Sequence, residues 1–380
     1  MNLTPITKVK KLKGKHVLLR LDLNVPIKNG EVGSNFRIKK SLQTIRFLKK
    51  AGAKVIIISH IGRNKSDTLK PIAQYMNKYT RVGFVPDVVD DIAKSAVENI
   101  KNGSAIMLEN LRKHDEELNN DRGFAKQLAE FADIYVNDAF AVSHRKNASI
   151  TQLPKLLPSF IGILFEYEIK NLSFALKPPK QFLLILGGAK METKLPLLNK
   201  YVDIAQHIYV GGALANTLLK EKGLEIGKSI ADSSGIKGIK KLSVHERIIL
   251  PVDVVVKNGG KVLVRKIDDI SASEAIVDIG TESITQLKKL ISKAKLIAVN
   301  GPLGNYEKGF DKSTIAALKS MSKSGARTIV GGGDTALFVS KLKLDKKLDF
   351  VSTGGGAMLE FLTKGTLVGI EAIQTSNKKI

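Results

Sequence analysis

The sequence contains no cysteine and no tryptophan, and aromatic residues make up only 6% of its 380 positions. The absence of cysteine excludes disulfides, zinc–thiolate centres and cysteine nucleophiles, and it suits a reducing compartment. No apolar run approaches the ~18 residues that a membrane-spanning helix requires. The lysines within residues 1–14 are not followed by the apolar stretch of a secretory signal. We therefore expect a cytoplasmic protein without a membrane segment.

Acidic residues are also scarce: 36 Asp and Glu stand against 61 Lys and Arg, so the formal net charge is +25. Such a charge attracts nucleic acids or small anions. The basic residues are mostly lysine, are spread along the chain, and form no block with interleaved aromatic residues. We interpret the excess as a solvated lysine surface and predict no obligate nucleic-acid partner. A nucleic-acid binder stays open as an alternative, and its binding would weaken steeply with salt.

The length of the chain suggests two domains, and a hydrophobic content of 43% is enough for globular cores. In the N-terminal half, short runs rich in β-branched residues or leucine alternate with helical stretches such as Phe36–Lys50 and Phe124–Ala132. The runs are Val17–Leu21, Val55–Ser59, Ala105–Leu108 and Ile134–Val136. Strands that alternate with helices predict a parallel sheet.

The C-terminal half repeats this alternation, and glycine follows each run within a few residues. The runs are Leu183–Leu186, Ile208–Val210, Ile276–Ile279, Leu296–Val299, Thr328–Val330 and Phe350–Thr353. Glycine is needed at the carboxyl edge of a sheet chiefly where a ligand comes close to the backbone. Between the halves we predict a helix over Phe165–Leu176, which Pro178 and Pro179 end.

These patterns predict an α/β fold of two domains, each a mostly parallel sheet flanked by helices, joined by a hinge helix. The first domain should comprise residues 1–168 together with a C-terminal tail at about 365–380. The second should comprise residues 169–364, with 165–179 as the connecting helix and hinge. We also expect a C-terminal strand and tail to return to the first domain.

Ligands of open α/β sheets lie beyond the carboxyl ends of the strands, so the residues after each run matter most. In the N-terminal half these residues are Asp22 and Asn24, His60 and Arg63, Arg112, and His144 and Arg145, with Arg37 opening the first helix. Each alone has a structural explanation, such as a surface ion pair or a turn hydrogen bond. Their repetition at one edge predicts a site for a small, multiply anionic molecule, because guanidinium groups bind phosphate and carboxylate bidentately.

The edge predicted for the C-terminal half is rich in glycine instead. Gly331–Gly333, Asp334 and Thr335 follow a run and open a helix, where free N–H groups and the helix dipole favour phosphate. Asp334 is a candidate ligand for Mg²⁺, or only a helix N-cap. Lys190 follows another glycine turn and Lys194 lies one helical turn later on the same face, although either lysine also fits a solvated surface.

The segment Gly331–Ala336 also fits part of a dinucleotide-binding fingerprint, which keeps an NAD-dependent dehydrogenase as an alternative. That function would not explain the arginine-rich edge. It would also need an acidic residue ~20 positions after the motif to bind the ribose, and Asp345 and Asp349 come too early. Absence of NAD-dependent hydride transfer would exclude it.

Eight motifs occur along nearly the full chain: Leu19–Pro26, Ser59–Arg63, Leu108–Arg112, Val136–Phe140, Ile185–Lys190, Asn300–Gly304, Gly331–Thr335 and Ser352–Gly356. In these motifs and in their order, the chain resembles the phosphoglycerate kinase family. The resemblance implies two Rossmann-like domains, with 3-phosphoglycerate bound to the first and Mg²⁺ with ADP or ATP bound to the second. It implies reversible transfer of a phosphoryl group from 1,3-bisphosphoglycerate to ADP, directly and in line, after domain closure. We expect a monomer.

By this resemblance the glycerate would be bound by Asp22, Asn24, Arg37, His60, Arg63, Arg112 and Arg145. Lys190 would follow the transferring phosphoryl group and share the catalytic role with Arg37. Lys194 would bind a nucleotide phosphate, Glu307 the ribose and Asp334 the metal. The nucleotide would also be lined by Gly188, Gly212, Gly280, Gly301, Leu303, Gly332, Gly333 and Thr335.

Several positions depart from the pattern of that family. Ala213 stands where a third glycine is usual, and Asn305–Tyr306 stands where a Val–Phe pair is common. Ala141 replaces a glycine, Tyr167 replaces a lysine, and the segment around Lys240–Arg247 is shortened. Ala213 leaves the nucleotide base preference open. Since no predicted phosphate contact is removed, we expect an active enzyme.

Overall fold

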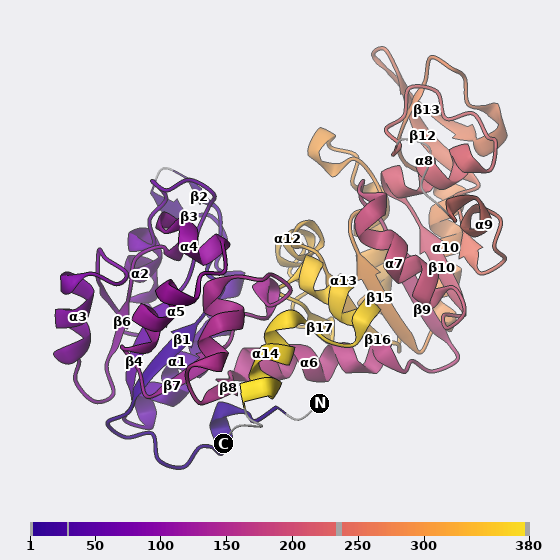
Figure 1. The fold of residues 1–380 in the computed structure, drawn as a ribbon. Helices are drawn as coiled ribbons and strands as arrows, with labels where there is room; N and C mark the ends of the chain where they lie inside the picture. Colours follow the sequence, from indigo (N-terminus) through magenta and orange to yellow (C-terminus); the bar gives the residue numbers. More distant parts are fainter. Residues whose placement is uncertain (1–2, 29, 233–237, 377–380) are drawn as a thin grey trace. The chain divides into compact units, whose positions relative to one another are not determined.

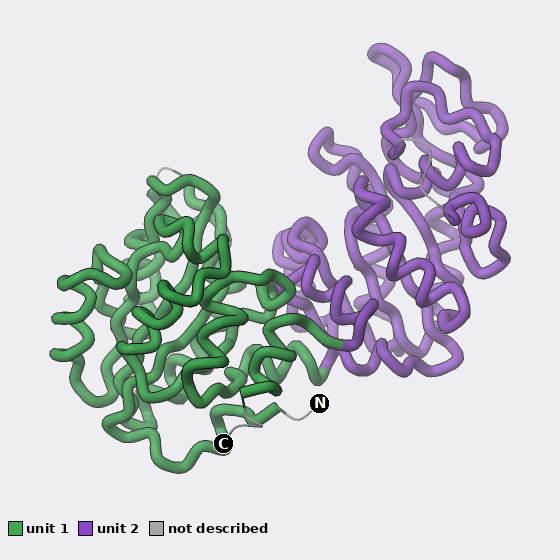
Figure 2. Tube along the Cα trace, viewed as in Figure 1, with its two compact units in different colours: residues 1–170, 366–380 green, residues 171–365 purple. Residues whose placement is uncertain are grey.

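The computed structural model describes residues 3–28, 30–232 and 238–376, and the chain divides into two compact units (Figure 2). Unit 1 comprises Met1–Lys170 and Thr366–Ile380, and unit 2 comprises Asn171–Gly365. The units thus divide at 170/171 and 365/366, where the sequence analysis placed the divisions at 168/169 and about 364.

Unit 1 is built on a six-stranded sheet of order β5-β6-β4-β1-β7-β8, in which every pair of neighbouring strands is parallel (Figure 1). The strands are β1 (His16–Arg20), β4 (Lys54–Ile58), β5 (Gly83–Phe84), β6 (Ala105–Met107), β7 (Ile134–Asn137) and β8 (Ser159–Ile161). Outside this sheet, β2 (Ile27–Lys28) and β3 (Glu31–Val32) form an antiparallel pair.

Helices cover both faces of the unit 1 sheet. On one face, Leu19 and Ile57 pack in a core with α1 (Phe36–Lys50) and α2 (Lys70–Met76). On the other face, Leu18 and Ile56 pack with α3 (Asp91–Glu98) and α5 (Arg122–Ala129). Alternate strand residues point to opposite faces, and burial of both faces explains the continuous apolar runs in the sequence. The remaining helical segments are Ile6–Lys8, Leu111–Lys113, α4 (Asp115–Leu118), Phe140–Val142, Ala148–Gln152 and Leu153–Lys155.

Unit 2 also contains a six-stranded parallel sheet, of order β11-β10-β9-β15-β16-β17. Its strands are β9 (Phe182–Leu186), β10 (His207–Val210), β11 (Ile248–Ile249), β15 (Leu296–Asn300), β16 (Arg327–Gly331) and β17 (Phe350–Val351). Its helices are α7 (Met191–Tyr201), α8 (Gly212–Glu221), α9 (Ile239–Ser243), α10 (Thr281–Lys293), α11 (Lys312–Met321), α12 (Gly333–Lys341) and α13 (Gly355–Lys364), with short turns at Ile267–Asp269 and Tyr306–Lys308. The predicted α/β architecture of two mostly parallel sheets is confirmed.

One predicted strand of unit 2 lies in a different sheet. Ile276–Ile279 belongs to β14 (Ala275–Ile279), which pairs antiparallel with β12 (Asp253–Asn258), and β12 pairs antiparallel with β13 (Lys261–Lys266). Assigning this run to the parallel repeat was wrong, because its neighbours along the chain form a local hairpin rather than a crossover helix.

The connecting helix α6 (Ile163–Leu176) begins in unit 1. Oδ1 of the buried Asp138 accepts a hydrogen bond from Phe165 N–H at 2.9 Å, and Thr44 Oγ1 accepts one from Ile163 N–H at 3.1 Å. A Cβ on Gly162 would lie 2.2 Å from Asp138 Oδ1, so this close approach requires glycine. The start of the connecting helix is therefore anchored by buried polar groups of unit 1.

The chain returns to unit 1 as a helix, α14 (Val368–Ser376), and the predicted C-terminal strand was wrong within the part of the chain that is described. Gly369 N–H donates to the carbonyl oxygen of Ser143 at 2.9 Å, and Ile370 and Ile373 are buried. Residues 377–380 of the predicted tail lie outside the described residues. None of the described helices is both long and apolar enough to cross a membrane.

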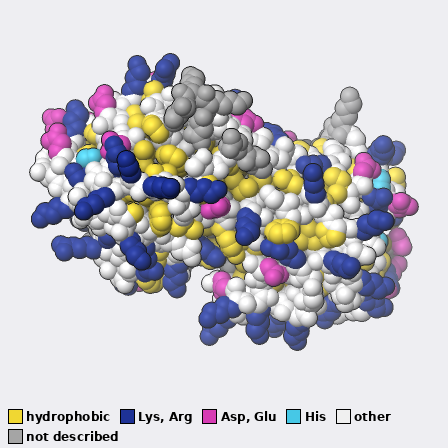
Figure 3. All heavy atoms as spheres, turned by 90° about the horizontal axis from the view of Figure 1, so that it is seen from below, with side chains coloured by type: hydrophobic (Ala, Val, Ile, Leu, Met, Phe, Trp, Pro, Cys, Tyr) yellow, Lys and Arg dark blue, Asp and Glu magenta, His cyan; other side chains and the backbone are white. Residues whose placement is uncertain are grey.

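The surface of the protein shows how the excess positive charge is distributed. On the face shown in Figure 3, Lys and Arg side chains are scattered among apolar and uncharged surface and do not gather into one block. This distribution agrees with a solvated lysine surface.

Candidate functional site

The first group of predicted site residues lies at the carboxyl edge of the unit 1 sheet. Arg37, the second residue of α1, forms an ion pair with Asp22 at 3.0 Å and donates to the carbonyl oxygen of Asn24 at 2.8 Å. Oδ1 of Asn24 accepts a hydrogen bond from Gly62 N–H at 3.0 Å. The loop after β1, the start of α1 and the loop after β4 are thereby tied together.

His60 is buried in an environment of positive charge. Nη2 of Arg20 lies 3.2 Å from His60 Nδ1, and because a guanidinium only donates, Nδ1 is the acceptor. Burial, followed by the charges of Arg20, Arg112, Arg145 and Arg37, lowers the pKa of His60 well below its ordinary value. His60 is therefore neutral near pH 7, with its remaining proton on Nε2.

Arg112 and Arg145 belong to the same cluster. The Arg112 guanidinium donates to the carbonyl oxygen of Gly62, and burial and then the charge of Arg145 lower the pKa of Arg112. Like charges held this close repel one another, so the cluster favours a bound anion. Arg63 is exposed on the loop after β4, and its side chain makes no hydrogen bond or ion pair with any described residue. His144 is half-buried beside Arg145.

Sequence reasoning missed the buried support of this cluster, Arg20 and Glu117, whose side chains are each 2% exposed. Glu117 accepts hydrogen bonds from the N–H of Ser149 at 2.8 Å and from its hydroxyl at 2.6 Å, and Arg20 Nε donates to that hydroxyl at 2.9 Å. An arginine that ends an otherwise apolar strand is the signal that the sequence offers for Arg20. Nothing distinguishes Glu117 from its exposed neighbours Asp115 and Glu116.

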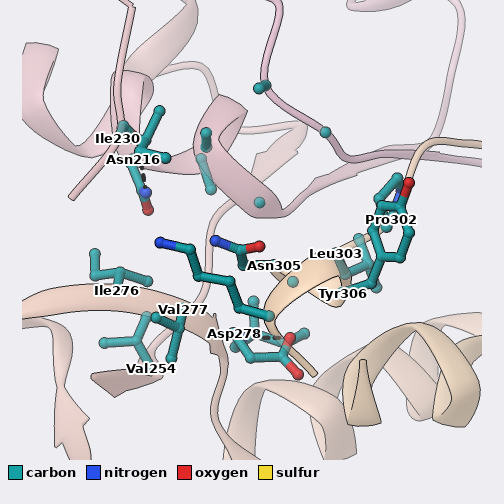
Figure 4. Close-up of a pocket in the computed structure, with 18 of the residues that line it drawn as sticks. Asn216, Ile230, Val254, Ile276, Val277, Asp278, Pro302, Leu303, Asn305 and Tyr306 are labelled. Atoms are coloured by element: carbon teal, nitrogen blue, oxygen red, sulfur yellow. Dashed lines mark hydrogen bonds between the residues drawn. The ribbon is translucent and has the colours of Figure 1, made fainter. Parts of the chain in front are cut away.

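Part of the second group of predicted residues lines a cavity of about 330 Å³ in unit 2 (Figure 4). A cavity of this size is typical of a site for a small ligand. Its walls include the apolar side chains of Leu219, Val254, Ile276 and Val277. The predicted nucleotide-binding residues that line it are Gly188, Gly212, Leu303, Glu307 and Asp334.

Glycine allows backbone segments to meet at this cavity. Gly212, the first residue of α8, has a φ of +63°, and a Cβ on it would lie 2.9 Å from Gly188 N. Gly301 has a φ of +91°, and its Cβ would lie 2.5 Å from the carbonyl oxygen of Gly187. The backbone conformation and the close approach of neighbouring segments thus require glycine at these positions, whether or not a ligand is bound.

Lys194, Asp334 and Tyr306 form a small polar group beside the cavity. Lys194 is 6% exposed and donates to the carbonyl oxygen of Gly187. Burial lowers the pKa of Lys194 to about 8, against the opposing charge of Asp334. Burial, a hydrogen bond to Asp334 and that carboxylate's charge raise the pKa of Tyr306 to about 12. Asp334 therefore has an ammonium group and a phenol as neighbours.

The remaining predicted residues do not line the cavity and lie mostly at helix starts. They are Lys190 before α7, Gly280 before α10, and Gly332 and Gly333 at the start of α12. Thr335 is buried, and its hydroxyl accepts a hydrogen bond from Gly301 N–H at 3.1 Å. Lys190 is exposed. Helix starts with free N–H groups are suitable positions for phosphate.

Among the described residues, no group of three or more His, Asp or Glu side chains is arranged to hold a metal ion. Asp334 is exposed in the first turn of α12. This single carboxylate fits Mg²⁺ that arrives with a nucleotide, since such an ion takes one or two protein carboxylates together with phosphate oxygens and water.

The sequence matches the family model described as phosphoglycerate kinase over residues 6–365. The chain belongs to the phosphoglycerate kinase family. It is 36% identical over 400 residues to a phosphoglycerate kinase from Leptospira biflexa, and the match covers 99% of each chain.

Solved phosphoglycerate kinase structures resemble the chain over its whole length. The Coxiella burnetii structure has a TM-score of 0.84 at 34% identity and covers 98% of this chain and 99% of its own. The Pyrococcus horikoshii structure has a TM-score of 0.89 at 28% identity and covers 100% of both chains.

The departures from the phosphoglycerate kinase pattern fall at identifiable places. Ala213 and Asn305 line the cavity of unit 2. Tyr306 packs edge-on against Phe338, with 5.6 Å between ring centroids. Tyr306 lines the cavity as well, so three of the departures lie in its wall.

Proposed function

We propose that the protein acts as a phosphoglycerate kinase, transferring a phosphoryl group reversibly from 1,3-bisphosphoglycerate to ADP in the presence of Mg²⁺. The observation that carries this proposal is that one member of the family contains two unlike features, one in each unit. One is the arginine cluster of unit 1 and the other is the glycine-walled cavity of unit 2. A dehydrogenase would not need the first, and a nucleic-acid binder would not need the second.

Unit 1 is proposed to bind 3-phosphoglycerate and 1,3-bisphosphoglycerate. The residues assigned to this role are Asp22, Asn24, Arg37, His60, Arg63, Arg112 and Arg145. The mutual repulsion of the guanidinium groups supports the assignment, because a ligand with several negative charges relieves it. His60 would donate from Nε2, since its Nδ1 faces Arg20.

Unit 2 is proposed to bind ADP or ATP, with the base and sugar in the cavity and Glu307 at the ribose. Lys194 and the starts of α7 and α12 would bind phosphate, and a bound phosphate would favour the protonated form of Lys194. Asp334 would hold Mg²⁺, which neutralises phosphate charge when it is bound. The other residues assigned here are Gly188, Lys190, Gly212, Gly280, Gly301, Leu303, Gly332, Gly333 and Thr335.

The chemistry requires no nucleophilic side chain, because the acyl phosphate is already an activated donor. A terminal phosphate oxygen of ADP attacks the acyl phosphorus in line, and the carboxylate of 3-phosphoglycerate leaves. Arg37 and Lys190 would stabilise the negative charge on the oxygens of the transferring group. A well-placed cation of this kind lowers the barrier by ~3–7 kcal/mol.

The two substrates are assigned to different units, and we propose that the units close during the reaction, which brings the substrates together and excludes water. We place the hinge at residues 165–179, around α6. Small-angle scattering should show a smaller radius of gyration with both substrates than with neither. An unchanged radius would contradict closure.

The direct test is a coupled assay of ATP formation from 1,3-bisphosphoglycerate and ADP. The unmodified protein should be active, and Arg37→Ala and Lys190→Ala should lose most activity while they remain folded. A folded protein without activity in either direction would refute the proposal. Hydride transfer with NAD, measured in parallel, would support the dehydrogenase instead.

A further inference from the structure

The cavity of unit 2 contains polar side chains that the proposed phosphate and ribose contacts do not use. Asn216, Asn305 and Lys308 line it together with apolar residues. Among those neighbours, Val254 is 1% exposed and Leu219 is 2% exposed. A few polar groups in an apolar pocket usually fix the orientation and identity of a ligand.

Asn305 is held firmly by its backbone. Its N–H donates to the carbonyl oxygen of Val277 at 2.8 Å, and its own carbonyl oxygen accepts from the N–H groups of Lys308 and Phe310, each at 3.1 Å. The side-chain amide makes no hydrogen bond to any residue in the described ranges. Figure 4 shows this amide in the middle of the pocket, with Ile230 and Asn216 to one side and Leu303 and Tyr306 to the other. A fixed main chain thus presents a donor and an acceptor to whatever occupies the cavity.

Asn216 offers a group of defined orientation. Its Nδ2 donates to the carbonyl oxygen of Ile230 at 2.9 Å (Figure 4). A carbonyl oxygen only accepts, so the amide cannot be reversed, and Oδ1 of Asn216 is left as the acceptor. The pocket therefore carries one fixed acceptor, from Asn216, and one amide that is able to turn, from Asn305.

We propose that Asn216 and Asn305 together recognise the 6-position of a purine base, and that the fixed acceptor of Asn216 selects a 6-amino purine over a 6-oxo purine. An amino group donates to the two amide oxygens, and a neighbouring ring nitrogen accepts from the Asn305 amide, as in the pairing of asparagine with adenine. A 6-oxo group would instead place an acceptor against the fixed acceptor of Asn216, leaving polar atoms unpaired. This inference depends on the proposed binding of a nucleotide in this cavity.

Lys308 is the group that would favour the opposite choice, because an ammonium donates to a 6-oxo oxygen. Its side chain is exposed, whereas the fixed acceptor of Asn216 lies on a residue that is 4% exposed. A donor in water already has hydrogen-bond partners and gains little from the base, while a buried acceptor that is left unpaired costs free energy. The buried group therefore decides the preference.

The test measures binding of ADP and of inosine diphosphate, which carries oxygen at the 6-position, by titration calorimetry with Mg²⁺. The unmodified protein should bind ADP about fivefold to tenfold more tightly, the effect of one or two hydrogen bonds. Asn216→Val, which removes the fixed acceptor, should reduce this ratio to within about twofold, and Asn216→Ala should do the same if the valine variant folds poorly. Asn258→Val, at an exposed position outside the cavity, is the matched control and should keep the full ratio.

The outcomes separate this inference from the proposed function. A ratio unchanged by Asn216→Val, with both nucleotides bound, overturns this recognition and leaves the proposed function standing. Tighter binding of inosine diphosphate by the unmodified protein overturns the amino preference, and a reversal of that order in Lys308→Ala would then assign the recognition to Lys308. If the folded protein binds neither nucleotide, the proposed function fails and this inference fails with it.

Discussion

At the carboxyl edge of the unit 1 sheet, guanidinium groups are held in place by buried partners, whereas at the same edge of the unit 2 sheet backbone segments meet at glycines around an apolar cavity. We propose that the first edge recognises its ligand by charge and the second by shape. Arg20 and Glu117 are fully desolvated to support the charged edge, while Gly212 and Gly301 adopt left-handed conformations to support the other. The same topological position thus gives different sites because different residue types follow the strands.

Among the tests of this comparison, we expect the largest effect from replacement of Arg37. Replacing it with alanine should lower kcat/KM by about a thousandfold, because the transferring group loses a cation that acts in the transition state. Arg46→Ala, on the exposed side of the same helix, is the matched control and should stay within about twofold of the unmodified protein. Equal losses of kcat/KM in the two variants would contradict a specific role of Arg37 in the transition state.

The buried support of unit 1 should be the next most sensitive feature. Glu117→Ala leaves the buried Arg20 guanidinium without its counter-ion and the Ser149 N–H without its acceptor, and we expect a loss of about 3–5 kcal/mol in the free energy of unfolding. Glu116→Ala, at the exposed neighbouring position, should change that free energy by less than about 0.5 kcal/mol. Urea denaturation compares the two, and similar midpoints would show that the pair does not support the edge.

In unit 2 the charge of Lys194 should make nucleotide binding depend on pH. As the pH rises above about 8, Lys194 loses its proton in the free protein, and nucleotide affinity should fall by up to about tenfold per pH unit. Lys194→Met should bind weakly without this slope. Titration calorimetry at pH 7 to 9.5 measures it, and an unchanged affinity would place the phosphate away from Lys194.

The same shift has the opposite consequence for stability without ligand. Unfolded Lys194 keeps its proton up to its ordinary pKa of 10.5, whereas the folded form loses it at about 8. Between these values the unfolded state binds more protons, so the contribution of Lys194 to the free energy of unfolding rises with pH. Denaturation between pH 8 and 10.5 measures this contribution. The free energy of unfolding should rise more steeply with pH for the unmodified protein than for Lys194→Met.

The smallest predicted effect concerns the glycine wall. Gly212→Ala should weaken nucleotide binding by about threefold to tenfold, because its left-handed backbone and its contact with Gly188 both resist a side chain. Affinity for 3-phosphoglycerate should not change, since that ligand is assigned to unit 1. Gly260→Ala, where a Cβ would meet nothing within 4 Å, is the control. Equal weakening of both ligands would argue that the two edges are not independent.

The sequence predicted the elements that alternate in a simple way. The central strands and α1 followed from apolar runs and helical periodicity, because both faces of a parallel sheet are buried. The edge strands β5, β8 and β11 were missed, as they have two or three residues and leave little pattern. The antiparallel sheet was missed although Gly259-Gly260 between two β-branched runs is a hairpin signal.

For the sites, residues just after strand ends were identifiable because topology brings those positions to one edge. The buried Arg20–Glu117 pair was not identifiable, since whether a charged residue is buried depends on contacts between segments far apart in sequence. The apolar cavity beside Asn305 could not be predicted from the sequence for the same reason. Its walls come from α8, β12, β14 and the loop after β15, and no single segment carries the pattern.

The return of α14 to unit 1 affects the order in which the two units fold during synthesis. Unit 2 forms from one continuous segment, Asn171–Gly365, whereas unit 1 needs residues from both sides of that segment. A Cβ on Gly369 of α14 would come within 2.9 Å of the Ser143 side chain, so this helix fits closely against the earlier part of the chain. On the ribosome, unit 2 is therefore able to reach its final packing first, and unit 1 must wait with an uncovered apolar face until α14 emerges.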